Sequence, residues 1–398
     1  MKKKIVLIII FLSMSVLCLG GIYFSKLYQN TNNYDKKNNV NNKNNLKNKQ
    51  EEIKIQEANP TEIVVKQGII EDSIEVLGVK DSKNFYGYKT SGELCVYNTD
   101  TKETKLFKKA VGKDMYIQTV SFSDKWIVWV EGSDKEKNNL SDGKGWVMYG
   151  ENIETGEVFI IDKDRAVGID YIPIIRSPQG ISIEGDNIVY SNVEVDNKKQ
   201  MVSVIKLVNI KERKTLQLDK IYDINSYSFS SPDIDGSNIV WGINKIMPEG
   251  KLTSNIILYN AITEKREVIS ENTSLYAPVI NKNFIVANLK LQDYNNIAIY
   301  DLNDRSKGWE NYVTGYLPVY NNELNTSIEQ PLFSEDYMIW WDNTMKGSYV
   351  INTKHNKVYT LDKSESMQVR GIYNKIAFWK EFIPNQPDKT ITKYAILK

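Results

Sequence analysis

The sequence contains a single histidine, His355, so any catalysis that needs an imidazole depends on this residue. A Ser-His-Asp triad would have to use it, and the chain has no nucleophile-elbow motif. His355 lies in Asn352–Lys357, a polar stretch between two apolar runs. We interpret it as a solvent-exposed turn residue rather than a general base or metal ligand.

The other metal-binding residue types are also sparse. The two cysteines, Cys18 and Cys95, are far apart in the sequence and form neither a zinc motif nor a disulfide framework. Asp162-Lys163-Asp164 and Asp233-Ile234-Asp235-Gly236 hint at calcium but lack the further oxygen ligands of a calcium loop. Asp and Gly are common turn residues, so we predict turns there. No glycine-rich phosphate loop is present. The sequence predicts no catalytic set, no metal and no cofactor.

The elements that would position any site follow a short repeated pattern. A turn with a small or polar residue precedes a strongly apolar strand that often ends in an aromatic residue. The instances begin 38 to 62 residues apart, at Lys83, Asp124, Asp186, Ser237, Asn283, Asp336 and Asn374. The recurring anchors Trp129, Tyr190, Trp241, Trp340 and Phe378 are interpreted as core residues packed between repeats.

Further apolar runs complete each repeat, as in Asn255–Asn260 followed by Glu264–Ile269. Three repeats carry a proline five residues before the anchor region, at Pro232, Pro278 and Pro331, which suits the entry to an inner strand. Four short strands in about 48 residues predict an all-β fold, a β-propeller of about seven four-stranded blades. Six blades, with one divergent repeat, is the alternative.

The segment Ser231–Trp241, followed by Ile256–Asn260 and Thr263, resembles a TolB-like propeller repeat and the tandem repeats of microbial surface propellers. The resemblance extends over residues 68–398 and is clearest in the third and fourth repeats. It implies a fold with mostly binding or scaffolding roles and transfers no catalytic residues.

The last repeat, Met367–Lys398, contains only three strands. Thr61–Lys66 is a strand-like segment without a repeat of its own, and we expect it to complete the last blade as its outer strand. Such a closure removes the exposed edges of an open array.

The N-terminus predicts export. Three lysines precede Ile5–Phe24, an apolar stretch long enough for a transmembrane helix. A retained anchor is our first interpretation, with a cleaved signal peptide and a lipoprotein at Cys18 as alternatives. Residues 26–58, rich in Asn and Lys, are expected to be a disordered linker. The predicted organisation is an anchor or signal sequence (1–25), the linker (26–58) and a propeller (59–398) on the outer face of a bacterial membrane, or secreted after cleavage.

The charge distribution argues against nucleic acid. The first 50 residues hold nine lysines and one acid, which leaves 42 basic and 49 acidic residues in the rest of the chain. An acidic body lacks the basic surface that nucleic-acid binding needs.

The segment Asn303–Gln330 appears as an insertion that breaks the repeat. It contains the candidate binding residues Trp309, Tyr312, Tyr316 and Tyr320. Other long loops are expected on the same face, at Glu131–Lys144, Asn192–Gln200 and Pro384–Lys389. Exposed aromatic residues on long loops favour an interface. Packing of these aromatic side chains on the propeller itself is the alternative.

Two functions stay open. The first is a non-enzymatic module that binds a protein or cell-wall glycan. The second is a glycan-active hydrolase or lyase that uses carboxylates or tyrosines at the central cavity, because a glycosidase needs only two suitably spaced acids. An enzyme should show acids with perturbed pKa values that converge at the centre, and a binding module should show an apolar, aromatic rim.

Overall fold

A computed structural model describes residues 63–70, 74–88, 93–113, 115–133, 145–164, 178–246, 252–290, 295–313, 331–342, 347–354, 357–363, 367–383 and 386–398. By contacts, the chain divides into a larger compact unit, residues 48–245 and 253–398, and a smaller one, residues 1–47 and 246–252. The larger unit contains the β-sheets apart from Ile246 and Leu252.

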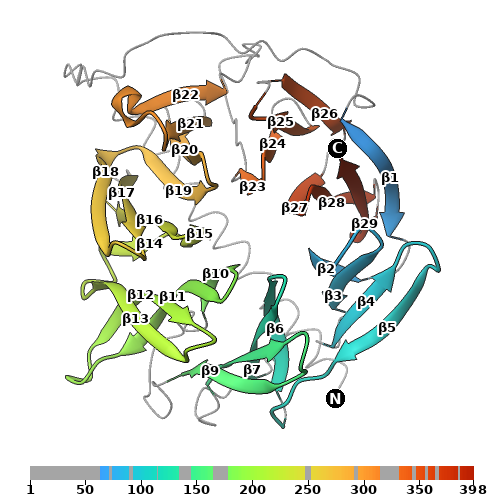
Figure 1. Cartoon of the computed structure of the whole chain (residues 1–398), viewed down its shortest axis with the longest axis horizontal. Helices are drawn as coiled ribbons and strands as arrows, with labels where there is room; N and C mark the ends of the chain where they lie inside the picture. Colours follow the sequence, from blue (N-terminus) through green and yellow to red (C-terminus); the bar gives the residue numbers. More distant parts are fainter. Residues whose placement is uncertain are drawn as a thin grey trace, which may run out of the picture. The chain divides into compact units, whose positions relative to one another are not determined.

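Seven antiparallel sheets form a ring, so this chain is a seven-bladed β-propeller (Figure 1). The predicted fold class and blade number are confirmed, and the six-blade alternative is wrong. In six blades the strands follow one another outward from the centre in chain order. The seventh combines the two ends of the described chain.

The strand bounds, blade by blade from the inner strand outward, are as follows. Blade 1 has β2 (Glu75–Val79), β3 (Asn84–Tyr88), β4 (Leu94–Asn98) and β5 (Glu103–Lys108). Blade 2 has β6 (Met115–Phe122), β7 (Trp126–Ser133), β8 (Val147–Asn152) and β9 (Val158–Lys163). Blade 3 has β10 (Gln179–Glu184), β11 (Asn187–Val195), β12 (Met201–Asn209) and β13 (Lys214–Ile221).

In blade 4 the inner strand is divided, and both parts pair with the second strand: β14 (Tyr227–Phe229), β15 (Asp233–Asp235), β16 (Asn238–Ile246), β17 (Leu252–Asn260) and β18 (Lys265–Thr273). Blade 5 has β19 (Leu275–Ile280), β20 (Phe284–Lys290), β21 (Asn295–Asp301) and β22 (Trp309–Val313). Blade 6 has β23 (Leu332–Ser334), β24 (Tyr337–Asp342), β25 (Gly347–Asn352) and β26 (Lys357–Lys363). Blade 7 has β27 (Met367–Tyr373), β28 (Ile376–Ile383), β29 (Gln386–Leu397) and β1 (Val64–Ile70).

The ring is closed by its first strand. β1 pairs antiparallel with β29, from Val64 opposite Leu397 to Ile70 opposite Thr392. The expected closure is therefore confirmed, although the strand lies slightly later in the chain than Thr61–Lys66. Gly68 is required in this pairing, because a Cβ atom there would lie 2.5 Å from the hydroxyl oxygen of Tyr394.

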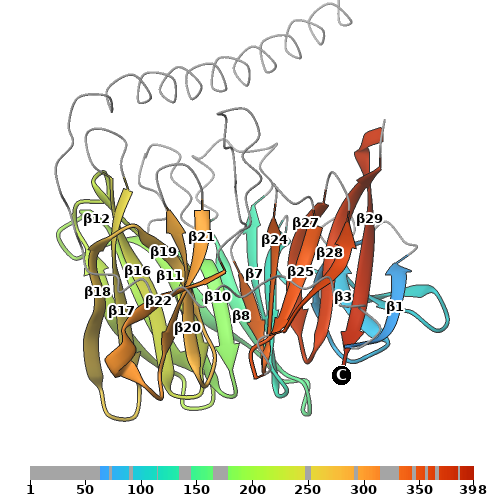
Figure 2. The same ribbon diagram turned by 90° about the horizontal axis from the view of Figure 1, so that it is seen from above.

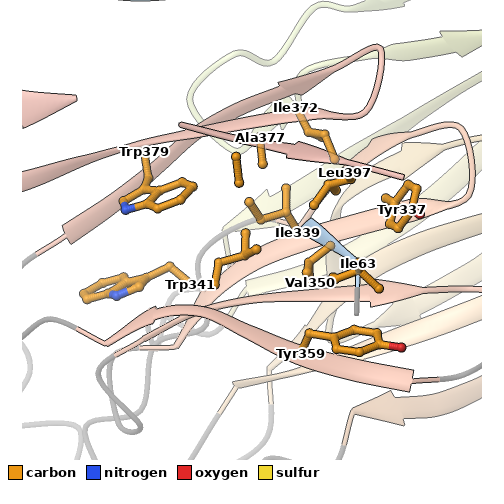
Figure 3. Close-up of a cluster of buried hydrophobic side chains, with 12 residues drawn as sticks. Ile63, Tyr337, Ile339, Trp341, Val350, Tyr359, Ile372, Ala377, Trp379 and Leu397 are labelled. Carbon is orange, nitrogen blue, oxygen red and sulfur yellow. The ribbon is translucent and has the colours of Figure 1, made fainter. Parts of the chain in front are cut away.

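The core lies between the blades, whose faces pack on each other around the ring (Figure 2). In the cluster between blades 6 and 7, Ile63 lies beside Val350 and Leu397, and Trp341 and Trp379 lie near each other (Figure 3). Ile63, the residue just before β1, is therefore part of the hydrophobic core between blades 6 and 7.

The five aromatic anchors are all fully buried: Trp129, Tyr190, Trp241, Trp340 and Phe378. The first four pack toward the preceding blade, whereas Phe378 packs toward blade 1. In blade 7 the neighbouring Trp379 faces the preceding blade instead. The position equivalent to the other anchors is therefore one residue later than the sequence pattern indicated.

An asparagine side chain stabilises the turn between the third and fourth strands in several blades. Asn98 Oδ1 accepts hydrogen bonds from the backbone N–H groups of Asp100 (3.0 Å) and Thr101 (2.9 Å). Asn260 does the same for Ile262 (3.1 Å) and Thr263 (2.9 Å). These side chains mimic a backbone turn, which accounts for the repeated Asn after an apolar strand.

Two of the three prolines lie where they were expected, at the entry to an inner strand. Pro232 directly precedes β15, the second part of the divided inner strand of blade 4, and Pro331 directly precedes β23. Pro278 instead lies inside β19, where the pairing register shifts between Tyr276 and Val279. Proline lacks a backbone N–H, so breaks and bulges tolerate it.

The predicted anchor at residues 5–24 and most of the linker lie outside the described residues. Across the ranges that the structure describes, there is no helix of sufficient length and apolarity to span a membrane.

Candidate functional site

Asp233 ties three blades together at the inner edge of the ring. It begins β15 in blade 4, and its Oδ1 atom accepts a hydrogen bond from the Ser182 hydroxyl of blade 3 at 2.7 Å. Its Oδ2 atom accepts one from the backbone N–H of Ile280 in blade 5 at 2.9 Å. An inner strand has no sheet partner on its central side, so a carboxylate from the next blade satisfies a backbone donor there.

Similar ties continue around the inner strands. The Ser121 hydroxyl of blade 2 donates to the carbonyl of Ile181 in blade 3 at 2.9 Å. Between blades 5 and 6, Asn281 Nδ2 donates to the carbonyl of Glu335 at 3.0 Å. Described contacts therefore connect the inner strands of blades 2 to 6 through polar groups.

Three carboxyl groups gather near these ties. Burial raises the pKa of Asp233, and the charge of Asp235 adds to this effect. Burial also raises the pKa of Asp235, partly offset by the charge and the backbone N–H of Lys282. The pKa of Glu184, at the end of β10, is raised by partial burial of its carboxyl and then by the charges of Asp235, Asp124 and Asp233.

This arrangement has one of the features expected of an enzyme, since acids with raised pKa values converge near the ring centre. Asp233 and Asp235, however, accept hydrogen bonds from backbone N–H groups of blade 5. Glu184 remains exposed and is the member that a ligand can reach. Among the described residues, no group of three or more His, Cys, Asp or Glu side chains is placed to hold a metal ion.

A second set of carboxylates lies farther out, between blades. Asp162, near the end of β9, is buried and accepts hydrogen bonds from the Tyr190 hydroxyl at 2.6 Å and Lys206 Nζ at 2.8 Å. Lys206 also pairs with Glu194 at 2.7 Å. Burial alone would raise the pKa of Asp162, but Lys206 and Tyr190 outweigh it and hold the pKa below its usual value.

The same arrangement recurs at two other interfaces. Asp219 Oδ2 accepts hydrogen bonds from Trp241 Nε1 at 3.1 Å and Arg266 at 3.0 Å. Asp362 Oδ2 accepts them from Trp379 Nε1 at 3.2 Å and Lys393 Nζ at 2.9 Å. In each case a carboxylate on one outer strand meets an aromatic donor and a cation of the next blade. We call these three clusters the outer latches.

A β-bulge immediately before each latch carboxylate directs it toward the next blade. The pairing register shifts so that Ile161, Leu218 and Leu361 are extra residues immediately before Asp162, Asp219 and Asp362. A bulge twists the strand and redirects the following side chain.

At two other interfaces the residue at the equivalent position is not a carboxylate. At blades 1 and 2, Lys108 takes the latch position and lies 4.5 Å from the centre of the Trp129 ring, while Trp129 Nε1 donates to Glu131 at 2.8 Å. At blades 5 and 6, Val313 is the residue at the equivalent position in the register of β22. The Nε1 atom of the fully buried Trp340 has no hydrogen-bond partner among the described residues.

The latches were missed in the sequence, where Asp162 was interpreted as a turn residue. That interpretation is wrong, because Asp162 lies in β9, and Asp233 and Asp235 lie in β15. A signal existed: the tripeptides Ile161-Asp162-Lys163, Leu218-Asp219-Lys220 and Leu361-Asp362-Lys363 share an apolar residue, Asp and Lys.

The predicted aromatic binding group is only partly described. Trp309 begins β22 and is half-buried, and its Nε1 donates to the carbonyl of Ile269 in blade 4 at 3.0 Å. Tyr312 is the extra residue in a bulge of β22. Tyr316 and Tyr320 lie outside the described residues, as does His355. Of the four aromatic side chains, that of Trp309 is the one within the described part of the structure.

Parts of the expected loops are regular structure. The supposed insertion contains a short 3-10 helix (η3, Arg305–Lys307) and β22, the outer strand of blade 5. Asn192–Gln200 is mostly the end of β11 with a tight turn, and β29 already begins at Gln386. In the described parts of these segments, the strands extend farther than the apolar runs indicated.

No protein-family model matches the sequence, and no curated protein matches it. Solved structures do match the fold. The β-propeller domain of the Trilobed protease from Pyrococcus furiosus, which has an open velcro topology, is 11% identical over 81% of this chain and 99% of that chain, with a TM-score of 0.53. In this chain, by contrast, β1 pairs with β29.

Two further structures show the same fold relationship. An acylaminoacyl peptidase from Pyrococcus horikoshii is 10% identical over 76% of this chain, with a TM-score of 0.52, and the match spans 47% of that chain. U3-55K is 9% identical over 83% of this chain and 98% of that chain, with a TM-score of 0.51. At such low identities these similarities support the propeller fold and no particular activity.

Proposed function

We propose that this chain is a non-enzymatic binding or scaffolding module, held on the outer face of a membrane, whose partner is a protein or a cell-wall glycan. The observation that carries the proposal is the use of its buried and half-buried carboxyl groups. Asp162, Asp219, Asp233 and Asp362 are all engaged in contacts between blades. These carboxyl groups, which could in principle act in catalysis, instead connect neighbouring blades. A propeller stabilised in this way is a suitable scaffold for binding a partner on its loops.

The location follows from the N-terminal sequence. Ile5–Phe24 has the length and apolarity of a membrane-spanning helix and follows three lysines. The Asn- and Lys-rich residues 26–58 would then connect this anchor to β1.

The proposed contact residues come from the end of β22 and from the segment that follows it in the sequence. Trp309 is held by Ile269 and by the Tyr300 ring, whose centre is 5.5 Å away, so we assign it a packing role. Tyr312, Tyr316 and Tyr320 remain the proposed contact residues, because tyrosine is enriched at interfaces.

Affinity capture with the full chain tests this proposal. The bait is the detergent-solubilised protein, and the target is a membrane and cell-wall extract of the native cell. The test variant carries Tyr316→Ala and Tyr320→Ala, and Trp309→Phe reports on packing alone. A partner retained by the wild type and by Trp309→Phe but lost by the tyrosine variant supports the proposal. Equal retention by all three would refute the binding residues, and no specific partner would refute the module.

A second function is favoured by one observation. Glu184 is an exposed carboxyl with a raised pKa beside Asp235, as a general acid in a glycan-active hydrolase or lyase would be. Incubation with cell-wall glycans tests it: shortened products from the wild type, but not from Glu184→Gln, would support an enzyme. Unchanged glycans with the wild type would remove this candidate.

A further inference from the structure

Tyr222 is the one exposed aromatic residue among those whose side chains the structure describes. It lies in the connection between blades 3 and 4 and is 63% exposed. The other aromatic side chains in the described part of the chain are buried or half-buried. Tyrosine is enriched in binding surfaces, where its ring and its hydroxyl group both make contacts. An exposed tyrosine on a connection between blades is therefore a candidate ligand contact.

Lysine ammonium groups accompany this tyrosine and its neighbour Tyr227. Lys220 Nζ lies 4.8 Å from the centre of the Tyr222 ring, and Lys245 Nζ lies 5.6 Å from the centre of the Tyr227 ring. Neither tyrosine belongs to a core cluster. The rings of the other described cation–π contacts instead pack between blades, at Trp129, Phe159 and Trp241. At the connection between blades 3 and 4, positive charge is thus combined with accessible rings.

Direct contacts join these residues to the neighbouring turn of blade 3. Asp196 begins the turn between β11 and β12, and its Oδ2 atom lies 3.8 Å from Lys220 Nζ. Within the connection, the N–H of Tyr227 donates to the carbonyl of Asp223 at 3.0 Å. Tyr227 also pairs with Lys245 in the sheet. We call the resulting continuous patch the basic–aromatic surface: Lys198, Lys199, Lys220, Tyr222, Tyr227 and Lys245.

The lysines of this surface are largely available to a ligand. Lys198 and Lys199 are exposed, and in the described part of the chain no ion pair involves them or Lys245. The two aspartates beside them, Asp196 and Asp223, already accept hydrogen bonds from backbone N–H groups of their own turns. Four lysines thus lie beside two carboxylates here, whereas residues 51–398 as a whole contain 42 basic and 49 acidic residues.

We propose that the basic–aromatic surface binds an acidic glycan, a polysaccharide whose sugars carry carboxylate or phosphate groups. The lysine ammonium groups pair with these anions, and the apolar face of a sugar ring packs on Tyr222. The acidic remainder of the chain repels a polyanion and confines the contact to this surface. This inference rests on the proposed function and selects the glycan from its two classes of partner.

The composition of the surface favours a glycan over an anionic membrane. Segments that lie on a membrane insert Trp, Phe or Leu among the lipid chains. The described part of this surface exposes none of these residues, and the adjacent Ile221 is buried. Anionic lipid headgroups would also be repelled by Asp196 and Asp223, whereas sugar hydroxyl groups can donate hydrogen bonds to carboxylates.

Sedimentation of the full chain, in mild detergent, with insoluble cell walls of the native cell tests the proposal. The two probes are intact walls and walls from which hydrofluoric acid has removed the acidic polymers. We expect binding to the intact walls that weakens as salt is raised, and little binding to the stripped walls. Lys220→Ala together with Lys245→Ala should weaken binding to intact walls roughly tenfold or more.

Lys125→Ala together with Lys265→Ala is the matched control. Both lysines are exposed and lie at the opposite end of the blades, Lys125 just before β7 and Lys265 at the start of β18. This variant should bind like the wild type. Tyr222→Ala should bind more weakly than Tyr222→Phe, which keeps the ring, and near-ultraviolet circular dichroism checks that each variant folds.

Equal binding to stripped walls, or an equal loss in the control variant, would overturn the proposal. Hydrogen exchange across residues 219–227 that is slower in phosphatidylglycerol nanodiscs than in phosphatidylcholine nanodiscs would assign the surface to lipid and overturn it too. If the wild type does not bind walls but retains a partner in the affinity capture described above, the acidic-glycan inference alone is wrong. Absence of a partner in both experiments would refute the binding module itself.

Discussion

Carboxylates at the ring centre and carboxylates in the outer latches behave in opposite ways. At the centre, burial raises the pKa values of Glu184, Asp233 and Asp235, and neighbouring carboxylates add to this effect for Glu184 and Asp233. In the outer latch of blades 2 and 3, Asp162 is buried too, yet its pKa is lowered by Lys206 and Tyr190. The difference shows that the neighbouring groups, more than burial, decide whether a carboxylate in this fold is stable as an anion.

Removing the cation of that latch should have the largest effect. Lys206→Met leaves Asp162 and Glu194 in a buried site without their shared positive charge, and we expect a loss of about 3–5 kcal/mol in the free energy of unfolding. Denaturant titration at neutral pH measures it. Because the folded pKa of Asp162 is lowered, the stabilisation is present above its unfolded pKa and is lost as pH falls through the folded value. The penalty should therefore shrink in acid.

Arg266→Met is the matched control, because the Arg266 side chain is 42% exposed in its pair with Asp219. Solvent screening should limit its cost to about 0–1 kcal/mol. Equal losses for both variants would show that burial does not distinguish the latches.

Truncation of the central carboxylate should come second. Asp233→Ala removes the acceptor for the Ser182 hydroxyl and the Ile280 N–H, and we expect a loss of about 1–3 kcal/mol, measured by the same titration. Ser182→Ala removes only one of the two bonds and should cost less. If Asp233→Ala leaves the unfolding midpoint unchanged, the tie between blades 3, 4 and 5 does not stabilise the ring.

Two buried tryptophans allow an interface with a latch carboxylate to be compared with one that has none. Trp379 lies beside Asp362, and Trp340 lies at the interface of blades 5 and 6. Trp379→Phe loses a hydrogen bond to Asp362, whereas Trp340→Phe removes a buried N–H group that has no partner in the described part of the chain. Both changes leave a small cavity. Trp379→Phe should therefore destabilise the protein by about 1 kcal/mol more than Trp340→Phe in thermal unfolding. The reverse order would indicate that the latch hydrogen bond is not stabilising.

The smallest effect is expected at Glu184. Glu184→Gln removes a charge repelled by Asp235 and should raise stability near neutral pH by no more than about 0.5 kcal/mol, because the residue is exposed. Since the wild-type pKa is raised, the contribution of Glu184 is favourable in acid and is lost as pH rises. Thermal melts over a pH series should show the gain near neutral pH and its disappearance in acid. A gain that grows in acid would contradict the assigned sign.

The sequence predicted the ring well because a propeller repeats a single apolar strand pattern. The blade number followed from it, and so did the closure by an N-terminal strand, which was expected at Thr61–Lys66 and is observed at Val64–Ile70. The latches could not be predicted in the same way. At Ile161 and Leu361 the bulge breaks the two-residue alternation, so a regular strand pattern wrongly places the next Asp on the solvent side. For the same kind of reason, adjacent aromatics at Phe378 and Trp379 concealed which one faces the preceding blade.

The closing strand has a mechanical consequence. Any tension that reaches the propeller from its N-terminal side enters at Ile63, whose carbonyl accepts a hydrogen bond from the N–H of Lys398 at 2.9 Å. The load is then carried by the first rungs of the β1–β29 ladder, beginning at Val64 and Leu397. In the proposed tethered arrangement, the β1–β29 pairing that closes the ring would therefore also bear any force transmitted from the membrane anchor.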